Sequence, residues 1–405
     1  VSDIIKRLQG KIKLDFEVER MEPLFENKEA YSSFTERHNK AKVPTADLAS
    51  YSGNCYLGID AGSTTTKVAL VGEDGKLLYS FYSSNNGSPL ATTIRAIKDI
   101  YTKLPKDAKI VQSCSTGYGE ALIKSALMLD DGEVETVSHY YAAAFFDPKV
   151  DCILDIGGQD MKCIKIKNQT VDSVQLNEAC SSGCGSFIET FAKSLNYSVQ
   201  DFAKEALFAK HPIDLGTRCT VFMNSKVKQV LREGVSVADI AAGLSYSVVK
   251  NCLYKVLQLK KSDELGKHIV VQGGTMRNDA IVRGLEKLTG KEVFRSDCPE
   301  LMGALGCALY AKQLKTAEVT NLEDMMHQAQ FTSRQVQCNG CENQCAITRY
   351  TFGSGEHYFS GNKCEKVFSN KGNVSEKGVN AYEKKIELLF DRQVNIAAPL
   401  LTIGI

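Results

Sequence analysis

Two segments of the chain, residues 55–71 (CYLGIDAGSTTTKVALV) and 151–166 (DCILDIGGQDMKCIKI), share one local pattern. Each consists of an apolar run, a polar turn that contains glycine, and a second apolar run, which predicts strand, turn and strand. Both carry the spacing D-x-G-x-x-x-x-K, beginning at Asp60 and at Asp155. A supersecondary unit that recurs within a chain predicts two lobes built on the same plan.

Helical patterns alternate with short apolar runs, such as 109–117, between the two predicted hairpins. This alternation predicts an α/β fold with a largely buried sheet. A mostly helical stretch (186–262) and a further strand–turn–helix unit (268–290) follow. We therefore expect one lobe over 55–150 and a second over 151–315, whose last helix returns to the first lobe. The flanking divisions are expected to be a helical or extended arm and linker (1–54), a linker with a cysteine-rich segment (316–366), and the start of a further, truncated region (367–405).

Composition narrows the class of protein. The chain has 405 residues, of which 43% are hydrophobic and 24% charged, and its formal net charge is +1. A charge this close to zero gives no electrostatic footprint for nucleic acid or for an anionic membrane surface. No apolar run approaches the ~20 residues of a membrane-spanning helix, and the N-terminus carries no secretory signal. We expect a cytoplasmic protein without nucleic-acid or membrane partners, whose 14 cysteines serve packing, metal binding or redox chemistry.

Three glycine turns follow apolar runs, in GIDAGSTTTK, DIGGQD and VVQGGTMRN. Glycine lets backbone N–H groups approach phosphate oxygens, so each turn is a candidate phosphate-binding loop. One such turn alone is more often structural, but three in one chain predict a nucleotide site. The candidate nucleotide-contacting residues are Gly62, Ser63, Thr64 and Thr65 of the first turn, Gly157 and Gly158 of the second, and Gly273, Gly274 and Asn278 of the third.

Charged and polar side chains beside these turns are the candidate catalytic groups, namely Asp60, Lys67, Asp155 and Gln159. Lys67 adds a point charge for terminal phosphates. Asp60 and Asp155 are expected to hold a hydrated Mg²⁺ ion, because Mg²⁺ keeps several waters and takes few carboxylates. The chain contains neither G-x-x-x-x-G-K-[ST] nor G-x-G-x-x-G after a strand, which excludes a P-loop and disfavours a dinucleotide site.

The three turns, in this order, resemble those of the superfamily that contains acetate kinase, sugar kinases, heat-shock chaperones and actin. The resemblance implies an α/β, two-lobed, actin-like (ribonuclease H-like) ATPase fold that closes on ATP or ADP with Mg²⁺. It further implies that the first two turns hold the phosphates, whereas Gly273, Gly274 and Asn278 hold the adenosine.

Two cysteine segments, NEACSSGCGSFIE (177–189) and GTRCTVFMNSKV (216–227), resemble the cluster motifs of activators of 2-hydroxyacyl-CoA dehydratases and benzoyl-CoA-type reductases, the BadF/BadG/BcrA/BcrD ATPases. In that family two cysteines from each of two subunits hold one [4Fe–4S] cluster, which implies that Cys180 and Cys219 are ligands here. Cys184 departs from the family pattern, and we expect it to pack. A ligand set that includes Cys184, and the absence of a cluster, stay open as alternatives.

A second cysteine group follows the pattern C-x-x-C-x-x-x-C with a fourth cysteine further on. Its members are Cys338, Cys341, Cys345 and Cys364. Both a closed tetrahedral zinc site and a second iron–sulfur cluster fit this spacing. This segment and the N-terminal arm resemble the large multidomain activases, which implies that the chain corresponds to their second ATPase domain. The partner at the shared cluster is then a second copy of the chain or an upstream twin ATPase domain.

The resemblance implies an ATPase coupled to electron transfer. It would receive an electron from ferredoxin or flavodoxin and deliver it to an iron–sulfur dehydratase or reductase. A small-molecule kinase of the same superfamily is an alternative, although it needs a carboxylate base beside an acceptor hydroxyl, and no sugar-binding signature is recognisable. A non-catalytic binding protein with a zinc knuckle is the third hypothesis. Colour separates the three, because only an iron–sulfur protein is brown.

Overall fold

The computed structural model describes residues 19–177, 181–314, 322–370 and 381–390. It divides into two compact units, of which the first ends at Gln330 and the second begins at Phe331. Residues 391–405, the end of the further region expected over 367–405, lie outside the described residues, as does Cys180.

The first unit contains two five-stranded sheets with the same strand order. The sheet of lobe I consists, in spatial order, of β3 (Leu77–Ser84), β2 (Thr65–Gly72), β1 (Gly53–Ala61), β4 (Ala108–Thr116) and β5 (Asp131–Gly132). The sheet of lobe II consists of β8 (Thr170–Asn177), β7 (Met161–Lys167), β6 (Cys152–Ile156), β9 (Ile269–Gln272) and β10 (Phe294–Arg295). In each sheet three antiparallel strands are followed by two parallel ones. This confirms the predicted α/β fold with two lobes of one plan.

The register of the hairpins explains the repeated motif. Asp60 lies directly opposite Lys67 in the β1/β2 pair, and Asp155 lies directly opposite Lys162 in the β6/β7 pair. Residues directly opposite on antiparallel strands have Cβ atoms about 5 Å apart. The spacing D-x-G-x-x-x-x-K therefore places one acid and one base together at the turn end of each hairpin.

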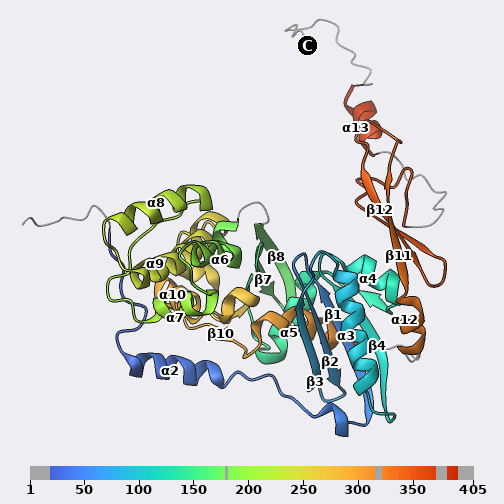
Figure 1. The fold of residues 1–405 in the computed structure, drawn as a ribbon, viewed down its shortest axis with the longest axis horizontal. Coiled ribbons are helices and arrows are strands. Elements are labelled where there is room, and N and C mark those ends of the chain that lie inside the picture. Colours follow the sequence, from blue (N-terminus) through green and yellow to red (C-terminus); the bar gives the residue numbers. More distant parts are fainter. Residues whose placement is uncertain (1–18, 178–180, 315–321, 371–380, 391–405) are drawn as a thin grey trace, which may run out of the picture. The chain divides into compact units, whose positions relative to one another are not determined.

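Two helices lie at the junction of the lobes (Figure 1). α11 (Met302–Ala311) packs on the sheet of lobe I, so the chain returns to that lobe after lobe II. α5 (Glu135–Phe146) packs against α11, where a Cβ at Gly306 would lie 1.7 Å from the carbonyl oxygen of Ser138, so only glycine permits this approach. Ala142 of α5 belongs to the apolar core of lobe I, and its neighbour Ala143 belongs to a core beneath the sheet of lobe II. Lobe I also carries the helices α3 (Pro89–Lys103), α4 (Glu120–Leu127) and α12 (Leu322–Gln328).

Lobe II carries a layer of helices, which are α6 (Gly185–Ser194), α7 (Val199–Leu207), α8 (Thr220–Arg232), α9 (Val237–Lys250) and α10 (Asp279–Thr289). Of these, α6 and α8 begin within the two cysteine segments. α9 is buried continuously from Ile240 to Val249, so it forms the centre of this helical layer. A π-helical turn (Asn251–Val256) continues it.

The described residues of the N-terminal arm pack on lobe II through α2 (Lys28–Asn39) and on lobe I through the residues after it, where the Leu77 N–H donates to the carbonyl oxygen of Pro44 at 2.8 Å. Helix α2 lies along lobe II (Figure 1), and the buried side chains of Leu24, Phe25 and Phe34 belong to the core of lobe II. The Tyr31 hydroxyl donates a hydrogen bond to Asp279 of α10 at 2.8 Å. Burial of the Phe25 and Phe34 rings makes α2 and the residues just before it a structural part of lobe II.

The second unit contains an antiparallel sheet of β11 (Phe331–Gln337), β12 (Ala346–Phe352) and β13 (His357–Ser360), together with α13 (Ala381–Phe390). The second unit, which contains the four clustered cysteines, begins at Phe331. This residue lies inside the division expected over 316–366. Among the helices that the structure describes, none is both long and apolar enough to cross a bilayer.

Candidate nucleotide site

The three glycine turns of the sequence analysis lie close together in the fold. The Thr275 hydroxyl, after the third turn, donates a hydrogen bond to the carbonyl oxygen of Gly157 in the second turn at 2.8 Å. A Cβ at Gly158 would lie 3.8 Å from the hydroxyl oxygen of Thr64 in the first turn. Turns from both lobes therefore border one site, as a nucleotide held between lobes requires.

A fourth turn, which the sequence analysis did not identify, belongs to the same site. Gly117 follows β4 as Gly273 follows β9, and the two have nearly the same backbone angle, φ +87° and +91°. A Cβ at Gly117 would lie 2.8 Å from Asp60 Oδ1, and a Cβ at Gly273 would lie 2.7 Å from Asp155 Oδ1. The repeat thus extends to the parallel strands. The signal was present in STG (115–117) at the end of the run 109–117.

Gly117→Ala should cost about 2 kcal/mol more stability than Gly290→Ala, because the added methyl group collides with the Asp60 carboxylate and with the backbone of Ala61. Gly290 is a matched control, since it also has a positive φ (+68°) but nothing within 4 Å of its Cβ position. Thermal unfolding of both variants measures the difference. Equal losses would show that Gly117 is needed for its backbone angle alone.

Asp60 is the most constrained carboxylate of the first turn. It is 4% exposed, and Lys67 Nζ lies 3.0 Å from its Oδ2, whereas the buried Oδ1 has no hydrogen-bond partner. Burial raises the pKa of Asp60, and the ammonium of Lys67 opposes that rise. A buried carboxylate oxygen without a partner is costly. This oxygen-rich, incompletely satisfied position fits a hydrated Mg²⁺ ion.

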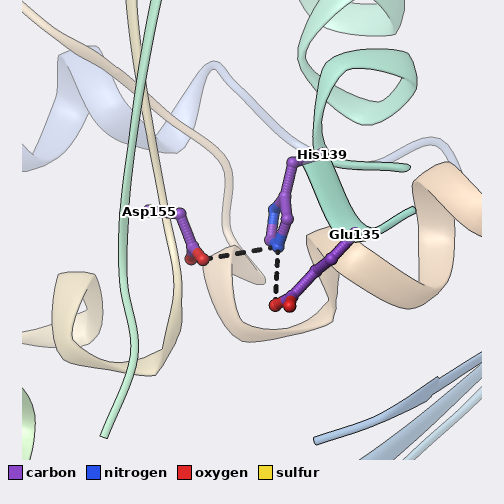
Figure 2. Close-up of side chains that lie close together, drawn as sticks. All are labelled: Glu135, His139 and Asp155. Carbon is purple, nitrogen blue, oxygen red and sulfur yellow. Dashed lines mark ion pairs between the residues drawn. The ribbon is translucent and has the colours of Figure 1, made fainter. Parts of the chain in front are cut away.

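Asp155 of the second turn lies in a buried ion-pair network (Figure 2). His139 Nε2 lies 3.4 Å from Asp155 Oδ2 and 3.5 Å from Glu135 Oε1, so the imidazole points between the two carboxylates. Lys162 Nζ lies 3.0 Å from Glu135 and 3.7 Å from Asp155. Burial alone would lower the pKa of His139, but Asp155 and Glu135 raise it to about 9. His139 is therefore a third cation of the site, beside Lys67 and Lys162.

The orientation of the His139 ring is fixed by Gln272, on the strand that precedes the third turn. Gln272 Oε1 contacts His139 Nδ1, and Gln272 Nε2 donates to the carbonyl oxygen of His139 at 3.1 Å. Nδ1 therefore carries a proton and donates a hydrogen bond to Oε1 of Gln272. Because Gln272 is paired with Asp155 in the β6/β9 register, one histidine ties α5 to the second and third turns.

Glu135, His139 and Gln272 belong to none of the sequence motifs that predicted the site. Within the described residues, Glu135, His139 and Asp155 are the one group of three His, Cys, Asp or Glu residues whose ligand atoms lie within 4.8 Å of one another. Lys162 contacts both carboxylates, so the group is balanced by ion pairs and does not require a metal ion. The spacing of Glu135 and His139, four residues apart on one helix, was the only local signal.

Most of the other candidate residues are accessible to solvent, whereas the side chain of Asn278 already forms a hydrogen bond within the protein. The exposed ones are Ser63, Thr64, Gly158, Gln159 and Gly274, and Gly62, Thr65, Gly157 and Gly273 are partly exposed. These are available to a nucleotide. Asn278 instead caps α10, because its side-chain oxygen accepts a hydrogen bond from the backbone N–H of Ala280 at 2.9 Å. Only its amide NH₂ group remains for the adenosine contact expected of it.

Comparison with known proteins decides the family. Residues 57–311 match the BadF/BadG/BcrA/BcrD ATPase family. The chain belongs to this family. It is 32% identical over 256 residues to the (R)-2-hydroxyglutaryl-CoA dehydratase activating ATPase of Acidaminococcus fermentans, covering 63% of this chain and 96% of the relative. It is 30% identical over 258 residues to the 2-hydroxyisocaproyl-CoA dehydratase activator of Clostridioides difficile, covering 63% and 94%.

Solved activator structures have the same fold. The crystal structure of component A of the Acidaminococcus fermentans (R)-2-hydroxyglutaryl-CoA dehydratase superposes with a TM-score of 0.57 at 29% identity, covering 64% of this chain and 98% of the other. The Clostridium difficile 2-hydroxyisocaproyl-CoA dehydratase activator with bound ADPNP gives 0.56 at 28% identity, covering 65% and 99%. The family, the actin-like fold and the ATPase class expected from the sequence are therefore confirmed.

Of the two cysteines that resemble the family's cluster ligands, Cys219 lies among the described residues and Cys180 does not. Cys219 is half-buried and precedes the first turn of α8, where Val221 and Phe222 are 75% and 67% exposed. Cys184 is fully buried in the core of lobe II at the start of α6, the environment of a packing residue. A thiol at an accessible helix N-terminus suits a metal ligand better than one inside an apolar core.

The four cysteines of the second unit are gathered at one end of its sheet. Cys338 follows β11 and Cys345 precedes β12, and the Cys338 N–H donates to the Cys345 carbonyl oxygen at 2.9 Å. Among the described residues no three of these sulfurs lie within 4.8 Å of one another, whereas zinc bonded at about 2.3 Å holds its sulfurs closer. Cys341 and Cys364 are exposed, so this end of the sheet has open access.

Proposed function

We propose that the chain is an ATP-dependent one-electron activator, in which nucleotide binding controls an iron–sulfur cluster held by Cys180 and Cys219. One observation carries the proposal. The backbone N–H groups of Gly185 and Ser186, the first residues of α6, donate to the carbonyl oxygens of Gly157 and Gly158 at 3.0 and 2.8 Å. The second phosphate turn therefore directly holds the helix that follows the NEACSSGCG loop.

When ATP binds, Mg²⁺ takes the place of the Lys67 ammonium beside Asp60, and Lys67 turns to the phosphates. Mg²⁺, when bound, would be held by Asp60 and Asp155 and would neutralise charge on the phosphates. Lys67 Nζ lies beside the first turn, 3.4 Å from the Cβ position of Gly62, so it can leave Asp60 for a terminal phosphate oxygen. The exposed hydroxyl groups of Ser63 and Thr64 then donate to the phosphates, and water enters beside Gln159.

The terminal phosphate distinguishes ATP from ADP, and it contacts hairpins of both lobes. The terminal phosphate binds one arrangement of the two lobes more tightly than the other. This difference in binding free energy sets how far ATP can shift the equilibrium between the two arrangements. A shift from 1:99 to 99:1 requires about 5.5 kcal/mol. Charge-assisted contacts of about 1.5–3 kcal/mol each from Lys67 and the turn N–H groups are of the required size. The Gly157–Gly185 bond carries the change to the start of α6.

The cluster, when bound, supplies one-electron redox chemistry. Cys180 and Cys219 provide two thiolates, so two more come from a twin, which is a second copy of the chain or an upstream ATPase domain. The exposed Val221 and Phe222 beside Cys219 support a partner surface there. Ferredoxin or flavodoxin would donate the electron, and an iron–sulfur dehydratase or benzoyl-CoA-type reductase would accept it, in the reducing cytoplasm where thiols remain available.

Anaerobic purification followed by iron reconstitution tests the proposal. We expect a brown protein with broad visible absorbance that hydrolyses ATP, and loss of both colour and partner association after iron chelation. A colourless ATPase that binds no iron at this site after reconstitution would contradict it and would favour a kinase or a binding protein.

The second unit should bind one metal independently of the ATP site. Replacing both exposed ligands in the Cys341→Ser/Cys364→Ser variant should remove that metal, zinc or iron, because a four-thiolate site cannot keep its ion on two. Elemental analysis of the full chain measures the loss, and unchanged ATP hydrolysis shows that the first unit is intact. Full metal content in the double variant would refute the site.

A further inference from the structure

The helical layer of lobe II carries positive charge that the composition of the whole chain hides. Residues 181–262, which include α6 to α9, contain eleven Lys or Arg and six Asp or Glu, a formal charge of +5. The whole chain has a charge of +1, so the residues outside this stretch carry −4. Charge separated in this way within one chain creates a local positive potential that attracts an acidic partner.

A large part of the unbalanced charge lies on α8 and directly before it. Three lysines of α6, α7 and α9 are neutralised by ion pairs, namely Lys193 with Glu189 at 2.6 Å, Lys204 with Asp201 at 3.3 Å and Lys250 with Asp214 at 2.5 Å. No Asp or Glu occurs between Asp214 and Glu233. The four cations of that interval have no ion-pair partner among the residues that the structure describes, and they are Arg218, Lys226, Lys228 and Arg232.

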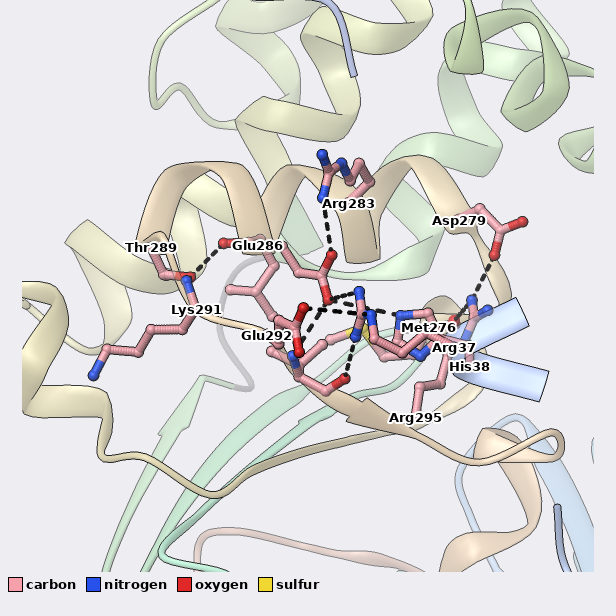
Figure 3. Close-up of polar contacts among 12 residues, drawn as sticks. Arg37, His38, Met276, Asp279, Arg283, Glu286, Thr289, Lys291, Glu292 and Arg295 are labelled. Atoms are coloured by element: carbon pink, nitrogen blue, oxygen red, sulfur yellow. Dashed lines mark hydrogen bonds and ion pairs between the residues drawn. The ribbon is translucent and has the colours of Figure 1, made fainter. Parts of the chain in front are cut away.

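Elsewhere in lobe II, cations that serve packing are paired with acids. Arg37 of α2 pairs with Glu286 of α10, and Arg295 of β10 pairs with Asp279 of α10, each at 2.6 Å (Figure 3). These pairs hold α2 and β10 against α10. The cations of α8 hold no other described element in this way, so packing does not account for them.

The geometry of α8 turns its cations outward. The buried residues of this helix are Met223, Val227 and Val230. Lys228 and Arg232, four residues apart, lie together on the exposed face. The helix dipole favours cations in the last turn, which accounts for these two. It does not account for Arg218, which is exposed and precedes the N-terminal end, where the dipole is positive.

The exposed cations flank Cys219 along the chain. Arg218 directly precedes it, and Arg232 is the last residue of α8, about 20 Å from Cys219 at a rise of about 1.5 Å per residue. A protein that gives an electron to a cluster at Cys219 has to approach this end of α8. Electron-transfer encounters use small contact areas, and complementary charge brings the two proteins together.

We infer that the surface formed by Arg218, Lys228 and Arg232 docks an acidic electron-donor protein; the inference rests on the proposed function, which supplies the cluster at Cys219. Carboxylates of the donor would pair with the guanidinium and ammonium groups. The positive potential would also raise the rate of association. A nucleic acid would be attracted to the same charges, but their place beside a redox centre fits a redox protein.

Calorimetric titration of the full chain with oxidised ferredoxin tests the inference, because no electron moves and binding alone is measured. We expect binding at a salt concentration of about 0.05 M that weakens at least fivefold at about 0.3 M, where exposed charges are screened. Lys228→Gln/Arg232→Gln should bind at least fivefold more weakly than the parent at low salt. The matched control Lys193→Gln/Lys204→Gln removes two exposed lysines of the same layer that are already paired, and it should bind as the parent does.

Equal affinity in the two double variants, or no binding of ferredoxin by the parent, would overturn the inference. So would a DNA duplex that binds in place of ferredoxin and is lost in the same variant, since that result assigns α8 to nucleic acid. Iron counting and reduction by methyl viologen, a small cation that needs no docking surface, report on the cluster separately. Full iron and the parental viologen rate in Lys228→Gln/Arg232→Gln place its defect in docking. A chain without iron contradicts the proposed function, and the ferredoxin titration still decides about the surface.

Discussion

Cys219→Ser protein should lose its iron–sulfur cluster while its ATP affinity stays within about twofold of the parent's. Removing one of two thiolates per chain leaves the cluster two ligands short if two copies share it, and one short if the partner is an upstream twin domain. Serine is itself a favoured residue at a helix start, so α8 should remain folded. Iron counting after anaerobic reconstitution measures the loss, and sedimentation with and without chelator measures the accompanying loss of association, because cluster binding contributes to pairing free energy.

Cys184→Ser is the matched control, since Cys184 also precedes a helix but is fully buried. We expect it to keep full iron at some cost in stability, because a hydroxyl replaces an apolar contact in the core. Full iron in Cys219→Ser would refute the ligand assignment. Loss of iron in Cys184→Ser alone would place the ligand at Cys184 instead.

Lys67→Ala should weaken ATP binding or turnover at least tenfold, a loss of about 1.4 kcal/mol. Lys67 Nζ neutralises Asp60 in the structure and lies beside the first turn, so its removal takes a charge from both the carboxylate and the phosphates. Leaving a buried carboxylate without its partner costs a further ~3 kcal/mol of stability. Nucleotide titration of the folded fraction separates the two effects.

Lys76→Ala is the control for that variant. Lys76 follows the next turn of the same sheet and pairs at 2.8 Å with Asp74, and both side chains are about half exposed. A surface pair of this kind contributes about 0–1 kcal/mol, so this variant should hydrolyse ATP normally. Unchanged ATPase kinetics in Lys67→Ala would remove Lys67 from the nucleotide site.

The sequence predicted contacts that are local in the chain better than contacts between distant elements. Asp60 and Lys67 could be paired from sequence, because seven residues around a tight hairpin place them opposite each other. His139 could not, since it comes from a helix between the lobes and its partner Gln272 lies 133 residues away. Only the packing of α5 against both lobes brings these side chains together.

The burial of each cysteine separates core residues from accessible candidate ligands, which the number of cysteines in the sequence cannot do. Cys55, Cys114, Cys152, Cys252 and Cys307, which are isolated in apolar runs of the sequence, are all buried. Cys298, also isolated, is only partly buried. In NEACSSGCGSF the two cysteines share nearly the same local sequence, so spacing cannot rank them. Cys184 directly precedes α6, and its side chain lies with that of Phe187 in the core of lobe II.

The central claim is that the ATP site controls an iron–sulfur centre through the bonds between Gly157–Gly158 and the start of α6. Electron paramagnetic resonance of the reduced, iron-loaded chain, recorded with ADP–Mg²⁺ and with a non-hydrolysable ATP analogue, tests it most directly. We expect two different cluster spectra from the parent chain, and one common spectrum from Lys67→Ala. Indistinguishable spectra from the parent with each nucleotide bound at saturation would contradict the claim.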